Sequence, residues 1–577
     1  MATLSVEKQT IFRLFSDKNS DFLIPDYQRP YAWDETECRT LWDDLFQFAF
    51  PENNYENFKK GDEYFLGPIV TFKNNEKLEI IDGQQRLTTL MLLLRAFYTN
   101  FSHMQDTPSK NIREDIEKCI WKSGELGELL TDELKIESLV STDEDKEEFK
   151  QILKSGILKD EYKSKYAIVF RFFKDKISDL LRDYPSYYAY LPARIMNNCI
   201  LLPIEAENQD TALRIFSTLN NRGLPLSDSD IFKSELYKIY SKLGKKDEFI
   251  KEWKELDVLC ERIFHPATGT SLDELFTRYM YYERAKRRNK LSTTEGLRKF
   301  YEKNDYSILK KEETFENLKL LADFWNSVSC QDKDRFSDEV LRKLFILNYA
   351  PNSMWTYITS VYFMAKKDCS SNLENTEFSN FLSKLIAFTW AYAITNPGVN
   401  ALRTPVFAEM INIIDGKRVT FSDYKFSVQN IKLLFNEFKF LNNRPITKSM
   451  IAWWMMQSAE QDIPKIDTTF EIEHIYSKKR LAIDPVSDSQ IIESIGNKAL
   501  LEKRINIRAS DYRIADKIKY YKGHTTTRKQ KVEPTINREL RSFSEATQFT
   551  ESDILNRKNA IINLFIDYLR SNELVNE

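Results

Sequence analysis

The hydrophobic pattern of the chain is strand-like mainly in its first hundred residues and helical over most of the rest. Short runs rich in β-branched and aromatic residues predict strands at residues 22–24, 69–72, 78–81 and 199–204. Apolar positions at helical spacing predict helices that include residues 5–15, 143–154, 210–219 and 450–456. Residues 104–160 are more charged and less apolar, and we interpret them as a helical insertion.

Capping signals mark several helix ends. Thr142 followed by Asp145 resembles a capping box, and Thr447 is placed to cap the helix at residues 450–456. Residues 220–223 (NNRG) read as a helix stop, and Ser227 as the cap of the next helix. From residue 237 to 440 the pattern is helical almost throughout.

Composition supports a helix-dominated protein of several domains. Only 14 Gly and 17 Pro occur in 577 residues, and 30% of residues are charged, which favours long amphipathic helices. The length exceeds the roughly 250 to 300 residues at which a single core stops growing. We therefore expect a mainly α protein with domains at residues 1–236, 237–440 and 441–577.

Charge and cysteine usage exclude several classes of protein. The net charge of −3 excludes a polycation, so any nucleic-acid surface must be local. The six cysteines form no CxxC pair, and we expect buried thiols in a reducing cytosol. No apolar run approaches the roughly 18 residues that a membrane helix needs, so we expect a soluble cytoplasmic protein without a membrane partner.

The segment at residues 80–97, IIDGQQRLTTLMLLLRAF, joins a predicted strand to an apolar helix through a polar corner. A helix N-terminus offers unpaired N–H groups and a positive dipole end, and Gly83 allows close backbone approach. Gln84, Gln85 and Arg86 add side-chain donors, so an anion such as a phosphate would fit. The alternative is a structural turn in which Asp82 caps the helix and Arg86 pairs with a carboxylate. Spacing alone leaves both open, because the chain has no Walker motif.

A second group of polar residues lies near the C-terminus, in FEIEHIYSKKR and GNKALLEKRIN. A short strand predicted at residues 470–472 delivers Glu473 and His474, which leave it on opposite faces or splay at its end. This arrangement suits a metal ligand beside a general base. Asn506 could add a neutral oxygen ligand for a hard cation such as Mg²⁺, and Asn497, nine residues earlier, could fix the loop after His474. The alternative is a lone histidine with unrelated asparagines.

Two basic runs are candidates for contact with a polyanion. Residues 502–531 contain ten Lys or Arg against three acidic residues, next to the candidate hydrolytic site. Residues 284–290 (RAKRRNK) lie close to Tyr279, Tyr281 and Tyr282. For both runs the alternative is a solvated helix face.

Three N-terminal segments resemble the signature stretches of the ParB-like nucleotide-hydrolysing domain of GmrS-type restriction proteins. They are IPDYQRPYAWDETECRTLWDDL at residues 24–45, IIDGQQRLTTL at residues 80–90, and IFSTLNNRGLPLSDSDIFKSEL at residues 215–236. The C-terminal region resembles the HNH nuclease domain of the GmrD type. The resemblance implies a small α/β ParB/sulfiredoxin-like core, a helical middle region and a C-terminal ββα-metal HNH domain.

The resemblance also implies a role for each matching residue. A nucleoside triphosphate (NTP) would be bound and hydrolysed with the help of Asp82, Gly83, Gln84, Gln85 and Arg86, supported by Tyr27, Gln28 and Arg29, and enclosed by Asn220, Arg222 and Gly223. In the HNH domain His474 would be the general base, Glu473 and Asn506 the ligands of Mg²⁺ or another divalent cation, and Asn497 the loop-fixing residue.

This sequence departs from the family pattern at three positions. Ser477 stands where relatives often have Pro, and Lys498 where they have Leu; both lie in or beside the loop that places His474. Asn506 stands where many HNH enzymes have His, with the same ligand role.

The function expected from these features is a nucleotide-dependent endonuclease of anti-phage defence that restricts modified double-stranded DNA. Two alternatives stay open: a nucleotide-gated DNA-binding sensor with a degenerate nuclease, and a toxin that nicks DNA without specificity. Homodimerisation is plausible because one HNH site cuts one strand, although no heptad run indicates an interface.

Overall fold

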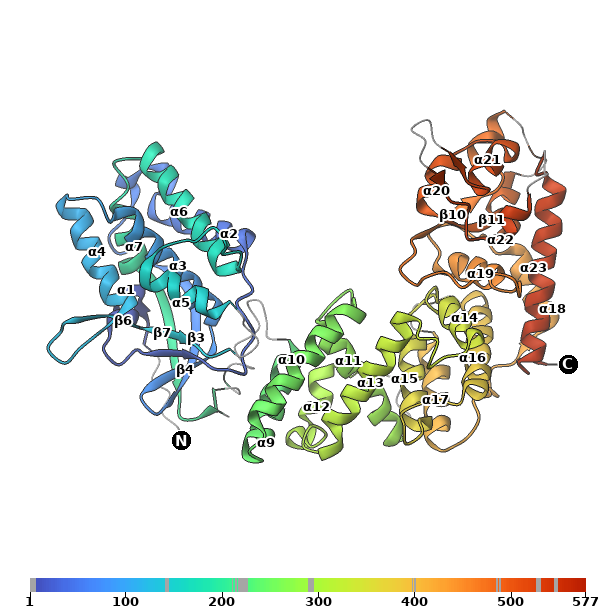
Figure 1. Cartoon of the computed structure of the whole chain (residues 1–577), viewed down its shortest axis with the longest axis horizontal. Helices are drawn as coiled ribbons and strands as arrows, with labels where there is room; N and C mark the ends of the chain where they lie inside the picture. The colour runs from blue at the N-terminus through green and yellow to red at the C-terminus, as the bar shows by residue number, and fades with distance from the viewer. Residues whose placement is uncertain are drawn as a thin grey trace. The chain divides into compact units, whose positions relative to one another are not determined.

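Helices make up most of the described chain, and the strands gather mainly in its N-terminal part (Figure 1). The computed structural model describes residues 7–140, 145–209, 211–212, 215, 227–288, 295–396, 398, 401–483, 486, 489–525, 531–543 and 548–576. The chain forms two compact units, one ending at Lys254 and the other beginning at Glu255. The predicted mainly α class is confirmed.

A six-stranded sheet forms the centre of the first unit, in the order β1-β8-β3-β4-β2-β7. Its strands are β1 (Gln9–Thr10), β2 (Phe22–Ile24), β3 (Tyr64–Asn74), β4 (Lys77–Asp82), β7 (Ile136–Ser138) and β8 (Cys199–Ala206). β3 runs antiparallel to β4 and parallel to β8, whereas β2 runs parallel to both β4 and β7. The four predicted strands are confirmed as β2 and as parts of β3, β4 and β8.

Eight helices belong to the first unit among the described residues, and α3 follows β4 directly. They are α1 (Ile11–Ser16), α2 (Glu35–Ala49), α3 (Gln84–Phe101), α4 (Thr107–Ile120), α5 (Lys146–Ser155), α6 (Lys165–Asp183), α7 (Tyr190–Asn198) and α9 (Asp228–Lys242). Apolar residues on every side of α3 are buried, because α4, α5 and α6 all pack against it. A helix that is apolar all round must lie inside the core.

The segment interpreted as a helical insertion is only partly helical. Between α4 and α5 the chain forms the hairpin β5 (Trp121–Ser123) and β6 (Leu129–Leu134), and then β7 joins the main sheet. Gly127, with φ +89°, accommodates the turn between the two hairpin strands, and its N–H donates to the Gly124 carbonyl. The helical-insertion prediction was therefore wrong for this part, where pairing with other strands overrides local pattern.

Helix ends follow the capping signals in some places and not in others. Ser227 caps α9 in a capping box, as predicted. The first helix begins at Ile11 rather than residue 5, because Gln9 and Thr10 pair with β8 and Thr10 caps α1. Thr447 does not cap a helix, because the helix already begins at Pro445 and Thr447 lies within it. The Thr447 hydroxyl instead donates to the carbonyl of Leu441, which precedes the helix. Thr142, and the stop predicted at residues 220–223, lie outside the described residues.

The second unit is helical up to its C-terminal part, as predicted from the period of its apolar positions. α10 (Lys246–Ile263) leads into it, followed by α11 (Ser271–Lys286), α12 (Leu297–Tyr306), α13 (Glu312–Cys330), α14 (Asp338–Leu347), α15 (Met354–Lys366), α16 (Asn375–Thr395), α17 (Arg403–Ile414), α18 (Val428–Glu437) and α19 (Pro445–Met455). The described part of the basic run, residues 284–288, is not a fully exposed face. Arg284 is buried and lies over the rings of Tyr281 and Phe407.

The burial of the cysteines agrees only in part with the prediction from composition. Cys38, Cys119, Cys199 and Cys260 are buried, as predicted, but Cys330 and Cys369 are exposed at or beyond helix ends, so the prediction was wrong for them.

Among the described helices, none is long and apolar enough to cross a membrane.

The C-terminal part is built on a second, two-stranded sheet. β10 (Phe470–His474) pairs antiparallel with β11 (Lys498–Glu502), and α20 (Lys503–Ala509), α21 (Ile514–Tyr521), α22 (Arg538–Ser542) and α23 (Glu551–Ser571) follow. Short two-residue strands complete this part: β12 (His524–Thr525) pairs with β13 (Lys531–Val532), and β14 (Val575–Asn576) with β9 (Phe426–Ser427). A buried apolar cluster joins β11, α20 and α21 to α23.

We expect Leu90→Ala in α3 to lower the free energy of unfolding of the first unit by about 2–5 kcal/mol, because it leaves a cavity in a core position with no solvent exposure. Urea denaturation of the full chain measures the change. Leu126→Ala is the matched control, since Leu126 is 97% exposed, and it should leave the transition unchanged.

Candidate functional site

The corner between β4 and α3 is a tight left-handed turn at Gly83. Gly83 has φ +94° and ψ 1°, and it caps α3 without any side-chain hydrogen bond. A Cβ at this position would lie 3.2 Å from Cγ1 of Ile69. The predicted order of strand, tight turn and helix is confirmed, and Asp82 is not the helix cap that the structural alternative required.

Three glutamines join this corner to the segment at residues 28–32. Gln28 Nε2 donates to the carbonyls of Ile80 and Ile81 at 3.3 and 3.1 Å. Gln84 Nε2 donates to the Arg29 carbonyl at 3.3 Å. Gln85 accepts the Ala32 N–H at 2.6 Å and donates to the Pro30 carbonyl at 3.2 Å. Two of the three N-terminal segments therefore form one structural site.

The charged groups of the corner are half-buried and are not paired tightly. Arg86 Nη1 donates to the Pro68 carbonyl at 2.9 Å, and within the described residues the guanidinium makes no ion pair. Burial raises the pKa of Asp82, against the effect of Arg86 and Arg29, and burial lowers the pKa of Arg86. The structural alternative, in which Arg86 pairs with a neighbouring carboxylate, is thus not what the described residues show.

Polar atoms at the start of α3 are left without partners. Arg29 Nε and Gln84 Oε1 are buried and make no hydrogen bond within the described part of the chain. Buried polar atoms are normally hydrogen-bonded, so such exceptions need a ligand, a water or another partner. Arg29 Nε and the N–H groups of the first helical turn could donate to an anion such as a nucleotide phosphate, whereas Gln84 Oε1 could only accept from a donor group of a ligand or a water.

Tyr27 directly precedes the segment at residues 28–32. Its ring packs against Tyr237 with centroids 5.4 Å apart, and burial, followed by the charge of Glu79, raises its pKa. Asn220, Arg222 and Gly223, which were predicted to enclose the pocket, lie outside the described residues.

His474 ends β10 on one face of the two-stranded sheet, directly opposite Lys498 of β11. His474 Nε2 lies 3.6 Å from Oε2 of Glu493, and Lys498 Nζ donates to the same oxygen at 2.7 Å. Burial, and next the Lys498 ammonium, lower the pKa of His474 to about 4. The imidazole is therefore neutral near pH 7, and Nε2 has no hydrogen-bond partner among the described residues.

Asn497 holds the backbone that follows His474. Its amide Nδ2 donates to the carbonyls of Tyr476 and Ile492, each at 3.0 Å, and Oδ1 accepts the Tyr476 N–H at 2.7 Å. The Asn497 carbonyl accepts the Ile475 N–H at 2.9 Å. The side chain has no solvent exposure. These contacts have the geometry that a loop-fixing residue needs, although the role itself stays a prediction.

Glu473 points to the opposite face of β10 and is already compensated by a cation. Its Oε1 accepts from Lys517 Nζ at 2.7 Å and from the Tyr521 hydroxyl at 2.6 Å. Lys517 Nζ also donates to the His474 carbonyl at 2.6 Å. Burial raises the pKa of Glu473, against the effect of Lys517.

Asn506 lies on α20 and its Nδ2 donates to Glu471 Oε2 at 2.9 Å. Its Oδ1 accepts no hydrogen bond from the described residues, so a neutral oxygen remains for a cation. No group of three or more His, Cys, Asp and Glu that could hold a metal occurs among the described residues. Mg²⁺ needs only one or two protein carboxylates, with water and phosphate completing its shell. A carboxylate and an amide oxygen thus fit this cation in kind, but it must compete with Lys517 for Glu473.

Sequence reasoning missed Lys517, Tyr521, Glu493 and Lys498. Lys517 was counted in the basic run at residues 502–531, but it is fully buried and faces the sheet instead of solvent. The available signal was its position on an amphipathic helix, four residues before Tyr521 and between the buried Ile514 and Ile518. Other cations of the run, among them Lys503, Arg504 and Lys519, are exposed.

Two family models match the chain. The model described as GmrSD restriction endonuclease, N-terminal domain, matches residues 11–237, which contain the β4–α3 corner. The model described as GmrSD restriction endonucleases, C-terminal domain, matches residues 426–564, which contain His474, Asn497 and Asn506. Together the matches cover more than half of the 577 residues. No curated protein matches the chain.

We expect the thermal stability contributed by Glu493 to disappear in acid. Burial alone would raise the pKa of Glu493, but Lys498 and Lys478 lower it to about 2, well below the usual value of 4.5. A carboxyl whose pKa is lower in the folded state stabilises the fold above about pH 4.5 and loses this contribution as pH falls toward 2. Glu493→Gln should therefore lower the melting temperature at pH 7, with a difference that shrinks between about pH 5 and pH 3.

Melting curves of the wild type and the variant across this range provide the measurement. Glu460→Gln removes an exposed carboxylate and serves as the control. A difference that stays constant down to pH 3 would contradict the expected titration.

Proposed function

The chain belongs to the GmrSD restriction endonucleases and is thus a DNA endonuclease of the type IV restriction kind, and from this premise we propose that it is a nucleotide-dependent HNH nuclease. In this proposal an NTP is bound and hydrolysed at the β4–α3 corner. Nucleotide binding or turnover regulates cleavage of the phosphodiester backbone at His474. The substrate is modified double-stranded DNA of invading phage.

The observation that carries the proposal is the state of His474. Its imidazole is neutral, its Nε2 is not used by the described residues, and Asn497 holds the backbone on its C-terminal side. A general base needs a free lone pair and a fixed position at the proton it removes. His474 accordingly accepts a proton from the attacking water, and Glu493, 3.6 Å away, stabilises the imidazolium that forms.

Glu473 and Asn506 would hold a divalent cation such as Mg²⁺. When bound, the cation supplies stabilisation of the charge that develops on the phosphate and the leaving oxygen. Exposed cations of α20 and α21, such as Lys503, Arg504 and Lys519, contribute long-range attraction for the DNA backbone. This charge orients the duplex but does not select a sequence.

The corner acts as a regulatory site instead of the site of DNA chemistry. Arg29 and Arg86 bring two positive charges close to the N-terminus of α3, where phosphate oxygens are favoured. To change cleavage a thousandfold, the nucleotide must bind one conformation about 4 kcal/mol more tightly than the other. Such a protein acts in the cytoplasm, where it meets phage DNA. As a homodimer it would bring together two HNH sites, one to cut each DNA strand.

A second candidate is a nucleotide-gated DNA sensor whose nuclease is degenerate. It is favoured by the ion pair between Lys517 and Glu473, because a buried ammonium 2.7 Å from the carboxylate opposes a divalent cation there. Incubation of the full chain with Mg²⁺, with and without each NTP, on phage genomes carrying hydroxymethyl, glucosyl or phosphorothioate modifications separates the two functions. Binding without any cleavage would favour the sensor.

We expect His474→Ala to reduce DNA cleavage by about 10² to 10⁴-fold while leaving NTP hydrolysis intact, because it removes only the general base. Gel-based cleavage and phosphate-release assays on the same preparation measure both activities. His265→Ala replaces an exposed histidine and should change neither. Cleavage at the wild-type rate by His474→Ala would refute its assigned role.

Arg86→Ala should first weaken nucleotide binding. Losing a charge-assisted hydrogen bond of about 1.5–3 kcal/mol raises Kd by roughly ten- to a hundredfold. Calorimetric titration with each NTP gives the affinity. Arg182→Ala, which removes an exposed arginine of the same unit, is the control. Unchanged NTP affinity in Arg86→Ala would exclude this corner as the nucleotide site.

A further inference from the structure

A buried arginine of the C-terminal helix reaches the turn that carries Asn497. Arg557 of α23 directs Nε and Nη2 to the two carboxylate oxygens of Glu539, both at 2.7 Å. Its Nη1 lies within hydrogen-bonding distance of the carbonyls of Ile495, Gly496 and Lys498, at 3.2, 3.0 and 2.8 Å. One side chain therefore connects α22 with the Asn497 turn, which we define as residues 495–498.

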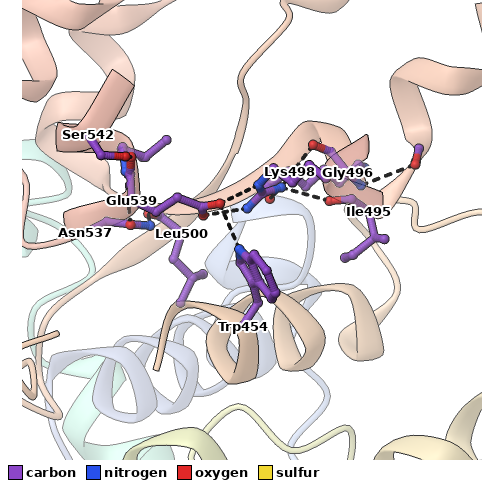
Figure 2. Close-up of polar contacts among 11 residues, drawn as sticks. Trp454, Ile495, Gly496, Lys498, Leu500, Asn537, Glu539 and Ser542 are labelled. Carbon is purple, nitrogen blue, oxygen red and sulfur yellow. Dashed lines mark hydrogen bonds and ion pairs between the residues drawn. The ribbon is translucent and has the colours of Figure 1, made fainter. Parts of the chain in front are cut away.

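Figure 2 shows how these groups converge. Glu539 from α22 and Trp454 from α19 face the segment that holds Gly496 and Lys498. Trp454 Nε1 donates to Glu539 Oε1 at 2.9 Å, which fixes the carboxylate that in turn orients Arg557. Asn537 Nδ2 donates to the Leu500 carbonyl at 2.9 Å farther along β11. Helices that follow the nuclease strands thus hold one edge of β11.

The backbone of α23 also lies directly on the Asn497 turn. A Cβ at Gly496 would come within 2.0 Å of the Ile554 carbonyl and 2.8 Å of the Lys558 nitrogen. No side chain fits in this position, so glycine is required at residue 496. The turn is therefore held from outside by α23 and from inside by the Asn497 amide.

The contacts continue from the turn to the general base. Arg557 holds the carbonyls on both sides of Asn497, whose side chain and carbonyl bind the N–H groups of Tyr476 and Ile475. Arg557 also holds the carbonyl of Lys498, the residue paired across the sheet with His474. Displacement of the guanidinium would move both supports of His474 at once.

A lysine could not make the same contacts. The planar guanidinium binds a carboxylate with two parallel N–H groups and still presents other donors, whereas an ammonium is a single point of charge. Arg557 uses one edge for Glu539 and the remaining nitrogen for the turn. Its identity, and not only its charge, matters for the geometry.

We propose that Arg557, oriented by Glu539, is a positioning residue of the nuclease, which places His474 by clamping the Asn497 turn. This inference rests on the proposed cleavage at His474. It adds that the C-terminal helix, far from that residue in sequence, is part of the catalytic apparatus.

The test compares Arg557→Lys and Arg557→Met with Arg570→Met in the full-length protein. Arg557→Lys keeps the charge beside Glu539, so it should stay folded, which melting curves verify. We expect kcat for DNA cleavage to fall on the order of 10²-fold in Arg557→Lys with little change in KM, because misplacement by about 1 Å is enough for such a loss. Arg570 is an exposed residue of the same helix, paired with Asp567, and its variant should match the wild type.

Hydrogen exchange of the Ile475 and Tyr476 amides gives a readout that does not require cleavage. Both amides should exchange faster in Arg557→Lys than in the wild type, because their acceptors belong to Asn497. Wild-type kcat together with wild-type exchange would overturn the proposal, as would a loss of kcat that only follows the unfolded fraction. If the wild type cleaves no DNA, the proposed function fails by itself, and the exchange of these two amides still decides whether Arg557 clamps the turn.

Discussion

The antiparallel pairing of β10 with β11 is the constraint on which the candidate nuclease site depends. Two strands of five residues are too small to be stable alone, so helices must cover and hold them. The register places His474 opposite Lys498 on one face and directs Glu473 to the other. Lys517 and Tyr521 then bind the second face, and Arg557 holds the turn that begins β11. The position of His474 is thus supported by α21 and α23.

Both candidate sites contain buried or half-buried charges that are compensated in different ways. In the nuclease part, Glu473 has a direct ion pair with Lys517, and Glu539 one with Arg557. At the β4–α3 corner, Asp82 and Arg86 influence each other's pKa without a close ion pair. Removing one partner of a buried pair is costly, because the other charge stays in a medium of low dielectric constant. In the proposed function, an anionic nucleotide would complete the compensation at the corner.

Local sequence signals were sufficient where one segment determines its own structure. The strand, glycine turn and apolar helix at residues 78–101 were predictable, because burial, φ freedom and helical period all agree there. The strand ending at His474 was predictable because Phe470 and Ile472 alternate with polar residues. Local signals failed at residues 121–138, where the strands form only by pairing with other segments. They also failed at Arg284 and Lys517, because a basic residue reads as exposed unless its tertiary partners are known.

The amino-acid sequence by itself determined the helical character of the chain, the corner at Gly83 and the types of residue near His474. Local conformational preference and burial of short apolar runs are enough for these features. Only the tertiary structure decided which charges meet: Lys517 with Glu473, Lys498 with Glu493, and Arg557 with Glu539 and the Asn497 turn. These partners lie 5 to 62 residues apart in the chain. Coulomb interactions depend on distance in space and on burial, and neither can be read from the order of residues.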